Sequence, residues 1–333
     1  MKKKWTLLLI ICLGMLCISY FGITQFLLRE QSSRTTVHFK DSYGPYFVPV
    51  SISKFTDVGI PCLNAEIEDK VVSLKLDLGF QGELGVWGSF IDQIPSKTFL
   101  YTQAIGGFRG IKHENNVYKI PKITIGAMSF YQPELQEESD QFLNECVINE
   151  ENAEPSPHEP GRIGWEFFRN FNLFLDLKNS RVAFCNSLDP LSQYGYEISK
   201  FIKAPLLIER GLIEVEAKTA EGPLRCMLDT GATWNVLNTE LEAGKTIEQA
   251  ALDPENILQN ASFHIGESDF GALAFHRFPL KFPIHVDAIL GMEFFQDHIV
   301  FIDFSENCIY FQKASELPKV AVDAEHPSEV KEG

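Results

Sequence analysis

One pattern in this sequence occurs twice, in the same order. VSLKLDLGFQGELGVW (72–87) resembles PLRCMLDTGATWNVL (223–237), because each has an apolar run, then Asp-x-Gly, then a second apolar run. Further along, GRIGWEFFRNFNLFLDLKNSRVAF (161–184) aligns without a gap with AILGMEFFQDHIVFIDFSENCIYF (288–311). A chain that repeats itself in this way contains two copies of one structural unit. We therefore expect two similar lobes.

Both copies have the periodicity of β-strands. CLNAEIEDKVVSLKLD (62–77) and GLIEVEAKTAEGPLRCMLD (211–229) alternate apolar and polar residues across a short polar turn. This pattern predicts a β-hairpin in front of each Asp-x-Gly. Short strands between turns rich in glycine and proline predict an all-β fold for both halves. With 333 residues, 45% of them hydrophobic, the chain is long enough for two packed lobes.

The repeat also sets the expected domain boundaries. The unit in front of the first copy is expected to be a stalk or a first strand, and the unit after the second copy a disordered tail. The full division is 1–30 for an N-terminal anchor, 31–54 for the stalk or first strand, 55–185 for the first lobe, 186–203 for a linker, 204–312 for the second lobe and 313–333 for the tail.

The first copy carries an insertion. Asp77 and Gly164 are 87 positions apart, whereas Asp229 and Gly291 are 62 apart. The difference of 25 is close to the length of the segment 134–159, which has nine carboxylates and no Lys or Arg. Such a charge run is typical of a solvated segment. We therefore predict that 134–159 is an acidic surface loop.

The N-terminus has the pattern of a membrane anchor. No charged residue lies between Trp5 and Leu28, and a helix of that length would span roughly 36 Å, enough to cross a bilayer. Lys2, Lys3 and Lys4 favour a cytoplasmic N-terminus, which places the rest of the chain outside the cytoplasmic membrane. We predict a single-pass signal anchor. A cleaved signal peptide, which would give a secreted protein, is the alternative.

Composition excludes some partners and ligands. The formal net charge of −16 would repel the phosphate backbone, so we expect no nucleic acid partner. No HExxH or other ligand spacing is present among the histidines, so we expect no metal and no cofactor. Beyond the anchor, five cysteines are widely spaced without a CxxC motif. Most of them are expected to be buried as small apolar residues.

The duplicated Asp-x-Gly indicates a chemistry. If the two halves pack face to face, Asp77 and Asp229 come together, and two close carboxyls share one proton and titrate as a coupled pair. One can then act as a general base on water and the other as a general acid. Gly79 and Gly231 allow the backbone to turn tightly after each aspartate. This apparatus suits hydrolysis of an amide by water, without a cofactor or a covalent intermediate.

These motifs resemble those of a known family. MLDTGAT followed by AILGMEFF is similar to one half of an aspartic protease of the retropepsin and pepsin type, and LDLGFQGEL resembles a variant in bacterial retropepsin-like proteins. The resemblance covers roughly residues 55–312. It implies two β-barrel lobes in one monomeric pseudo-dimer, catalytic Asp77 and Asp229, and a peptide or protein substrate. It also implies that Thr230 holds the two active loops together.

The resemblance further implies a flap, which is a glycine-rich hairpin that folds over the substrate. In the first half, YTQAIGGFRGIKHENNVYKIPKITIG fits such a hairpin, with Gly106, Gly107 and Phe108 near its tip. In the second half, FHIGESDFGALAF is a shorter counterpart.

Two departures from the family pattern bear on activity. The first loop reads Asp-Leu-Gly, and Leu78 cannot form the hydrogen bond that a threonine would give, a loss of about 1 kcal/mol or more. Phe80 and Ala232 stand where pepsin-like enzymes often have a hydroxyl, so the pair should be less acidic, with an optimum at mildly acidic pH.

The sequence leaves three readings of function open. The main one is a membrane-anchored aspartic endopeptidase. The alternative is a catalytically silent member of this fold that binds a peptide or protein in its cleft, which Leu78 favours. In a third reading only the second half is competent, and it pairs with another copy of the chain.

Other repeated residues have simpler interpretations. Asp176 and Asp303 precede polar turn residues, so a structural role in turns is expected. Glu166 and Glu293 are interpreted as supporting the fold. The segment HEPGR (158–162) is interpreted only as the turn before a strand at Ile163.

Overall fold

The computed structural model describes residues 36–38, 46–106, 112–138, 161–209, 211–240, 253–260, 262–281 and 285–314. These residues form mostly β-strands, in agreement with the predicted all-β class. The segment proposed as an anchor and the tail after Ala314 lie outside these ranges. No helix within the described ranges is long and apolar enough to span a bilayer.

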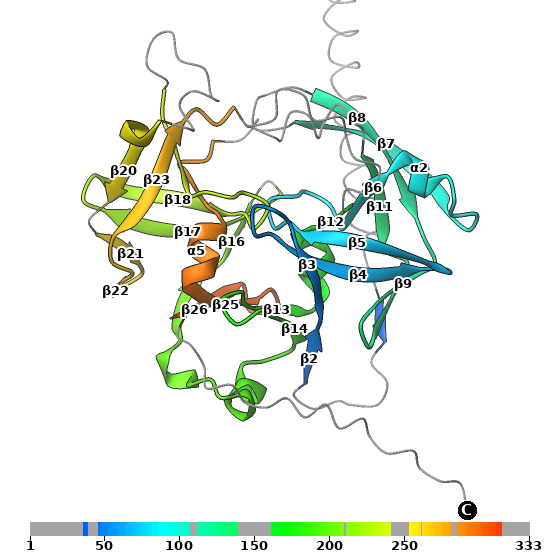
Figure 1. Ribbon diagram of the computed structural model, residues 1–333, viewed down its shortest axis with the longest axis horizontal. Helices are drawn as coiled ribbons and strands as arrows, with labels where there is room; N and C mark the ends of the chain where they lie inside the picture. The colour runs from blue at the N-terminus through cyan, green and yellow to red at the C-terminus, as the bar shows by residue number, and fades with distance from the viewer. Residues whose placement is uncertain are drawn as a thin grey trace, which may run out of the picture.

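The first lobe is built on one eleven-stranded sheet, on the right in Figure 1. Ten of its strands follow the order β1-β10-β9-β4-β5-β12-β6-β11-β8-β7, and β3 pairs with β4 at the side. The strands are β1 (Thr36–His38), β3 (Ile52–Phe55), β4 (Pro61–Ile67), β5 (Lys70–Leu76), β6 (Leu84–Trp87), β7 (Thr98–Gly106), β8 (Lys112–Lys119), β9 (Lys122–Ile125), β10 (Met128–Tyr131), β11 (Glu134–Glu138) and β12 (Gly161–Ile163).

The second lobe is built on a nine-stranded sheet, on the left in Figure 1. Its order is β20-β23-β19-β24-β18-β17-β21-β22, with β16 paired to β17. The strands are β16 (Leu207–Glu209), β17 (Leu212–Thr219), β18 (Gly222–Leu228), β19 (Val236–Asn238), β20 (Ile257–Asn260), β21 (Phe263–Ile265), β22 (Ser268–Asp269), β23 (Leu273–Phe278) and β24 (Ala288–Leu290).

The two sheets share one motif around the Asp-x-Gly turns. In the first lobe β12 runs parallel to β5 and antiparallel to β6, and β6 runs parallel to β11. In the second lobe β24 runs parallel to β18 and antiparallel to β19, and β19 runs parallel to β23. The predicted hairpins β4–β5 and β17–β18 are both present. The internal repeat in the sequence therefore corresponds to a repeated arrangement of strands.

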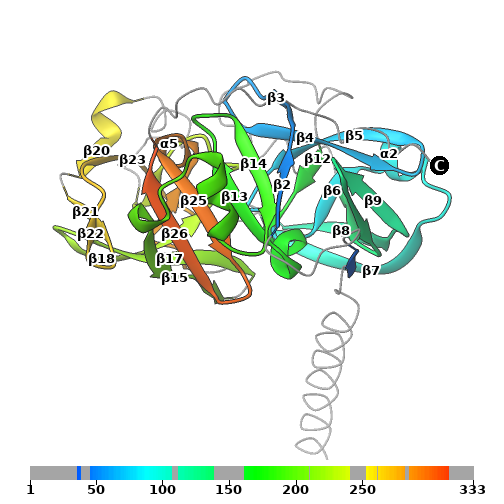
Figure 2. The same cartoon turned by 90° about the horizontal axis from the view of Figure 1, so that it is seen from below.

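A third sheet of six strands is shared by both halves and lies between the lobes in Figure 2. Its order is β15-β26-β25-β13-β14-β2. At its centre, Phe174 pairs with Phe301, which is the residue that the gap-free alignment assigns as its counterpart. A strand that pairs with its own copy in this way lies on the axis relating the halves. The strands are β2 (Phe47–Val50), β13 (Asn172–Asp176), β14 (Arg181–Cys185), β15 (Ile202–Pro205), β25 (His298–Asp303) and β26 (Cys308–Lys313).

Short helices follow the repeated glycines. The 3-10 helix η1 (Trp165–Asn170) follows Gly164, and α5 (Met292–Asp297) follows Gly291. Each supplies the two phenylalanines of Gly-x-Glu-Phe-Phe to an aromatic cluster in its lobe: Phe130, Phe167, Phe168, Phe171 and Phe184 in the first, and Phe270, Phe294, Phe295, His298 and Phe311 in the second. The other helices are α2 (Gly88–Ile91), η2 (Asp189–Tyr194), η3 (Ile198–Lys200) and η4 (Pro254–Asn256).

The prediction of an acidic surface loop is wrong at its start. Residues 134–138 form β11, which pairs with β6 and β8, and four of the five are buried while Glu137 is half-buried. Burial of its carboxylates is possible because each has a partner: Glu134 accepts a hydrogen bond from the Tyr101 hydroxyl, and Glu138 forms an ion pair with Arg162. The remainder of the segment, 139–160, lies outside the described residues.

The cysteines and the repeated aspartates behave as expected. Cys62, Cys185, Cys226 and Cys308 are buried free thiols, and Cys146 lies outside the described residues. Asp176 accepts hydrogen bonds from the side chain and the backbone N–H of Asn179. Asp303 accepts them from the backbone N–H groups of Ser305 and Glu306. Both aspartates therefore close the turns that follow their strands.

Candidate active site

The two Asp-x-Gly turns are held in the same way. The backbone N–H of Asp77 donates to the carbonyl of Ile163, and that of Asp229 to the carbonyl of Leu290, both at 3.0 Å. Each turn is then closed by an N–H three residues on, from Phe80 to the carbonyl of Asp77 and from Ala232 to that of Asp229. Each aspartate thus leaves its strand at the point where the neighbouring parallel strand ends.

The turns face each other, and the glycine of each turn lies against the aspartate carboxyl group of the other. A Cβ atom added to Gly79 would lie 2.5 Å from both carboxylate oxygens of Asp229. A Cβ atom on Gly231 would lie 2.5 Å from Cγ of Asp77. Each glycine therefore leaves the space that the opposite carboxyl group occupies. The structure brings Asp77, Gly79, Asp229, Thr230 and Gly231 together, from two halves that are 152 positions apart in the sequence.

Thr230 links the two turns. Its hydroxyl donates to the carbonyl of Leu76 at 2.7 Å and accepts from the backbone N–H of Leu78 at 3.0 Å. The Thr230 residue is fully buried, so neither backbone group can exchange this partner for water. This side chain fixes the first turn against the second.

Leu78 does not form the corresponding hydrogen bond from the first turn to the second. Its side chain is 1% exposed and belongs to the large hydrophobic core. A leucine side chain can neither donate nor accept a hydrogen bond. The two turns are therefore joined by one hydroxyl instead of two, as the sequence predicts.

The electrostatics of the pair are asymmetric. The pKa of Asp229 is raised to about 7, mainly by burial and also by the negative charge of Asp77 and a hydrogen bond between the two carboxyl groups. The backbone N–H groups of Gly231 and Ala232 act in the opposite direction, because they donate to Oδ1 of Asp229 at 2.8 and 3.2 Å. As the pH falls below about 7, Asp229 therefore takes up a proton beside Asp77.

Arg162 is a site residue that the sequence analysis missed. Its Nη1 lies 3.4 Å from Oδ2 of Asp77, its Nε donates to Glu138 at 2.6 Å, and its guanidinium covers the Phe80 ring at 4.4 Å. The sequence analysis treated HEPGR only as a turn. A signal was present, because Arg162 occupies the position that Ile289 has in the second copy.

Residues behind the second turn support it. Asn235 accepts a hydrogen bond from the N–H of Gly291 and donates its own backbone N–H to the Glu293 carboxylate. Glu293 therefore supports the fold, as predicted. Trp234 stacks on His276 with ring centroids 4.6 Å apart.

The predicted flap corresponds to the hairpin of β7 and β8. Its register runs from Thr98 opposite Lys119 to Gly106 opposite Lys112. Gly106 is the last residue of β7, whereas Gly107 and Phe108 lie outside the described residues. The counterpart in the second lobe is the much shorter hairpin of β21 and β22.

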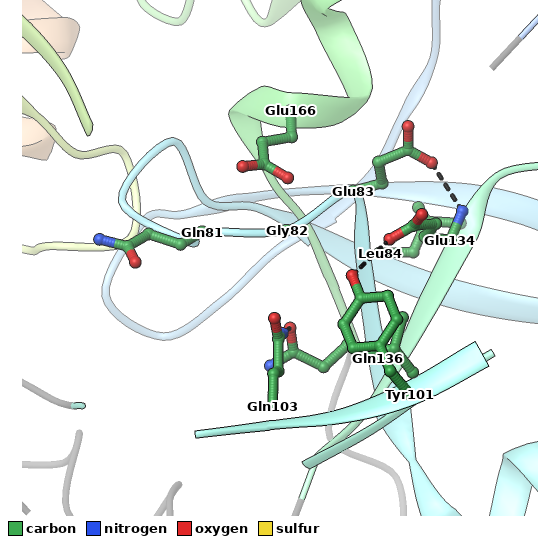
Figure 3. Close-up of a pocket in the computed structure, with 10 residues that line it drawn as sticks. Gln81, Gly82, Glu83, Leu84, Tyr101, Gln103, Glu134, Gln136 and Glu166 are labelled. Atoms are coloured by element: carbon green, nitrogen blue, oxygen red, sulfur yellow. Dashed lines mark hydrogen bonds between the residues drawn. The ribbon is translucent and has the colours of Figure 1, made fainter. Parts of the chain in front are cut away.

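A small polar pocket lies between the first turn and this hairpin (Figure 3). The volume of this pocket is on the order of what a single water molecule needs. Buried Gln136 accepts a hydrogen bond from Nε2 of Gln103, while its own Nε2 finds no hydrogen-bond partner among the residues that the structure describes. The lining residues are Gln81, Gly82, Glu83, Leu84, Tyr101, Gln103, Val117, Glu134, Gln136 and Glu166.

Comparison with known proteins identifies the fold. The structure is similar to basic 7S globulin from soybean, with a TM-score of 0.52 and 9% sequence identity over 82% of this chain and 95% of that chain. It is also similar to conglutin gamma, a basic 7S globulin from lupine seeds, with a TM-score of 0.52 and 10% identity over 81% and 95% of the two chains. Both globulins have an aspartic-protease-like fold. No family model and no curated protein matches the sequence. The likeness shows an aspartic-protease-like fold.

Proposed function

We propose that this protein is an aspartic endopeptidase in which Asp77 and Asp229 activate one water molecule. The observation that carries this proposal is the reciprocal contact of the two turns, in which Gly79 makes room for the Asp229 carboxyl and Gly231 for that of Asp77. A fold that needed these residues only as turns would not require their carboxyl groups to face each other in a buried setting.

The raised pKa of Asp229, about 7, supports a pair with one proton. In the proposed reaction the ionised carboxylate takes a proton from water while the water oxygen attacks the peptide carbonyl carbon. The protonated carboxyl gives its proton to the carbonyl oxygen, which yields a neutral gem-diol. When the C–N bond breaks, the nitrogen receives the proton taken from water, and a gem-diol hydroxyl returns a proton to the other carboxylate. The pair is then back in its starting state.

This protonation scheme sets the working pH. Above about pH 7 Asp229 loses its proton and the general acid is gone, so the rate of cleavage should fall as the pH rises through that value. An optimum at mildly acidic pH follows, in line with the absence of side-chain hydroxyls at Phe80 and Ala232.

We place the substrate between the turns and the β7–β8 hairpin. In this proposal an extended peptide binds in a β-like conformation, with its main chain along the hairpin. Because the N-terminal segment has the pattern of an anchor, we propose that the substrate is a peptide or protein outside the cytoplasmic membrane.

The test is cleavage of a mixture of unfolded peptides by the full-length chain in detergent, from pH 3 to 8, followed by mass spectrometry. Asp77→Asn and Asp229→Asn should each abolish cleavage. Asp269→Asn, at an exposed turn of the second lobe, serves as the matched control and should leave it unchanged. Cleavage that survives in both dyad variants would refute the proposal.

The second candidate is a binding protein that uses the same cleft without hydrolysis. Leu78 favours it, since the core holds a leucine where a second hydroxyl link would stand. The two structures that share this fold favour it as well, because both are named as globulins and neither as a peptidase. Folded protein that retains peptides but cuts none at any pH would support this function over the first.

A further inference from the structure

The surroundings of Asp77 and Asp229 differ, because a buried cluster of charged side chains, Arg162 and Glu138, lies beside Asp77. The Arg162 side chain is 7% exposed and that of its partner Glu138 is 1% exposed. Taking two charges out of water is costly, so a buried pair needs a close partner geometry to be tolerated. Here Glu138 fixes the guanidinium through Nε, and Nη1 reaches Asp77.

The second lobe shows that the fold does not need this charge. Arg162 pairs with Gly85 across β12 and β6, and the matching residues in β24 and β19 are Ile289 and Val236. Glu138 pairs with Trp87, and the matching position in β23 is Phe278, which pairs with Asn238. The second lobe therefore has three apolar residues, Val236, Phe278 and Ile289, in one hydrophobic cluster where the first lobe has Gly85, Glu138 and Arg162.

The three residues of the first lobe depend on one another. A Cβ atom on Gly85 would overlap Oε1 of Glu138, so the glycine makes room for the carboxylate. Glu138 in turn holds Arg162, and Arg162 contacts Asp77. The outcome is a positive charge beside one carboxyl of the pair, whereas the position behind the other carboxyl is occupied by Ile289.

We propose that Arg162 is a positioning residue that keeps the negative charge of the pair on Asp77, so that Asp77 is the base and Asp229 the acid. This inference rests on the proposed function for its catalytic meaning. Within the part of the chain that the structure describes, the charged groups found against Asp77 are Asp229 and Arg162, and Glu138 acts on it through Arg162. Phe80, on which the guanidinium lies, supplies no hydroxyl, so the arginine provides the stabilisation that a hydroxyl at that position would give.

The placement of the proton can be measured without any substrate. We would label the full-length chain in detergent with aspartate carrying 13C in its side-chain carboxyl and follow the 13C NMR signals from pH 3 to 9. Asp77→Asn and Asp229→Asn assign the two signals. At pH 6 the wild-type protein should show an ionised Asp77 and a protonated Asp229.

Removing Arg162 alone would leave Glu138 buried without its cation, and that variant could unfold. We would therefore copy the second lobe in the triple variant Gly85→Val, Glu138→Phe, Arg162→Ile, and pair it with the milder Glu138→Gln, Arg162→Met. In both variants the proton should be distributed over the two carboxyl groups, so that neither 13C signal is that of a fully ionised group at pH 6. The doubly protonated pair should lose its first proton about one pH unit or more above the wild-type value. Arg162→Lys should stay closer to wild type. Arg181→Met, whose side chain donates to Tyr194 and Tyr196 away from the pair, is the control.

The NMR titration and the cleavage assay together distinguish a failure of the proposed role of Arg162 from a failure of the proposed endopeptidase function. Below the first pKa of the wild-type pair, a one-unit rise lowers the fraction of the singly protonated pair up to about tenfold, so cleavage should fall most at pH 3, toward that limit, and change least at pH 6. Signals that titrate alike in wild-type protein and in both variants would overturn the role of Arg162, whether or not peptides are cut. Signals that shift as expected in a protein that cuts nothing would uphold the placement of charge and defeat the endopeptidase.

Discussion

The hydroxyl of Thr230 accepts a hydrogen bond from the backbone N–H of Leu78 at 3.0 Å and so joins the second lobe to the first. The same hydroxyl donates to the carbonyl of Leu76. Both backbone groups lie in the interior, where an unsatisfied donor or acceptor costs about 1–3 kcal/mol. The hydrogen-bonded link between the two turns that these bonds form therefore comes from a single side chain.

Thr230→Val removes this link while keeping the shape of the side chain. We expect the free energy of unfolding to fall by about 2 kcal/mol or more, because two buried backbone groups lose their partner. Urea unfolding followed by tryptophan fluorescence measures this. Thr239→Val, whose hydroxyl bond is exposed, should change the stability by less than about 0.5 kcal/mol. Equal effects of the two substitutions would mean that the hydroxyl of Thr230 is not a structural link.

Leu78→Thr tests what the missing second hydroxyl costs. By the symmetry of the repeat, a hydroxyl at position 78 would face the backbone of the turn that contains Thr230. Leu78→Val is its matched control, since valine and threonine have the same shape and only threonine has the hydroxyl. Both variants lose buried apolar volume, at about 1–3 kcal/mol. We expect the threonine variant to be more stable than the valine variant and to cut peptides faster. A threonine variant no better than the valine variant would contradict this reading of Leu78.

Gly231→Ala tests the face-to-face contact of the turns. Its Cβ would lie 2.5 Å from Cγ of Asp77, much closer than van der Waals contact allows, so the turns would have to separate. We expect at least a hundredfold loss of peptide cleavage, because a displacement of about 1 Å in a catalytic group has that effect. In Gly88→Ala the new Cβ meets mainly the end of the flexible Glu137 side chain, and the rate should stay within about twofold of wild type. Unchanged cleavage in Gly231→Ala would argue against the paired arrangement.

The raised pKa of Asp229 makes the free energy of unfolding depend on pH. Its ordinary value near 3.8 applies to the unfolded chain, and the folded value is about 7. Between these two values the folded state binds more protons than the unfolded state, so the free energy of unfolding falls as the pH rises and the full penalty is present above about pH 7. Asp229→Asn removes the penalty. Relative to wild type it should gain about 2–4 kcal/mol more at pH 8 than at pH 4, as measured by chemical unfolding at the two pH values. A gain that is equal at both pH values would show that Asp229 ionises normally.

The fold could be predicted because the repeat is a property of the sequence itself. The two hairpins, the Asp-x-Gly turns and the pairing of Asp77 with Asp229 all follow from placing one copy on the other. The repeat also contained the pairing of Phe174 with Phe301, although only the structure showed that these strands are adjacent.

The parts of the site that depend on non-local burial could not be predicted in this way. Glu134 and Glu138 lie in a run of carboxylates, and such a run is usually solvated, so the sequence analysis placed them in a loop. Their burial depends on partners elsewhere in the chain, Tyr101 and Arg162, which local charge patterning does not reveal. Reading the differences between the two copies, and not only their similarities, would have singled out Arg162 against Ile289.

The most direct test of the paired aspartates is calorimetric titration at pH 6 with a statine-type peptide and with the same peptide lacking its hydroxyl. The hydroxyl takes the place of the water between the two carboxyl groups, so only a site that stabilises the transition state distinguishes the two compounds. We predict that the wild-type protein binds the hydroxyl compound at least 100-fold more tightly, and that this preference disappears in Asp77→Asn and in Asp229→Asn. Equal affinity of the wild-type protein for both compounds would contradict the endopeptidase and identify the cleft as a peptide-binding site.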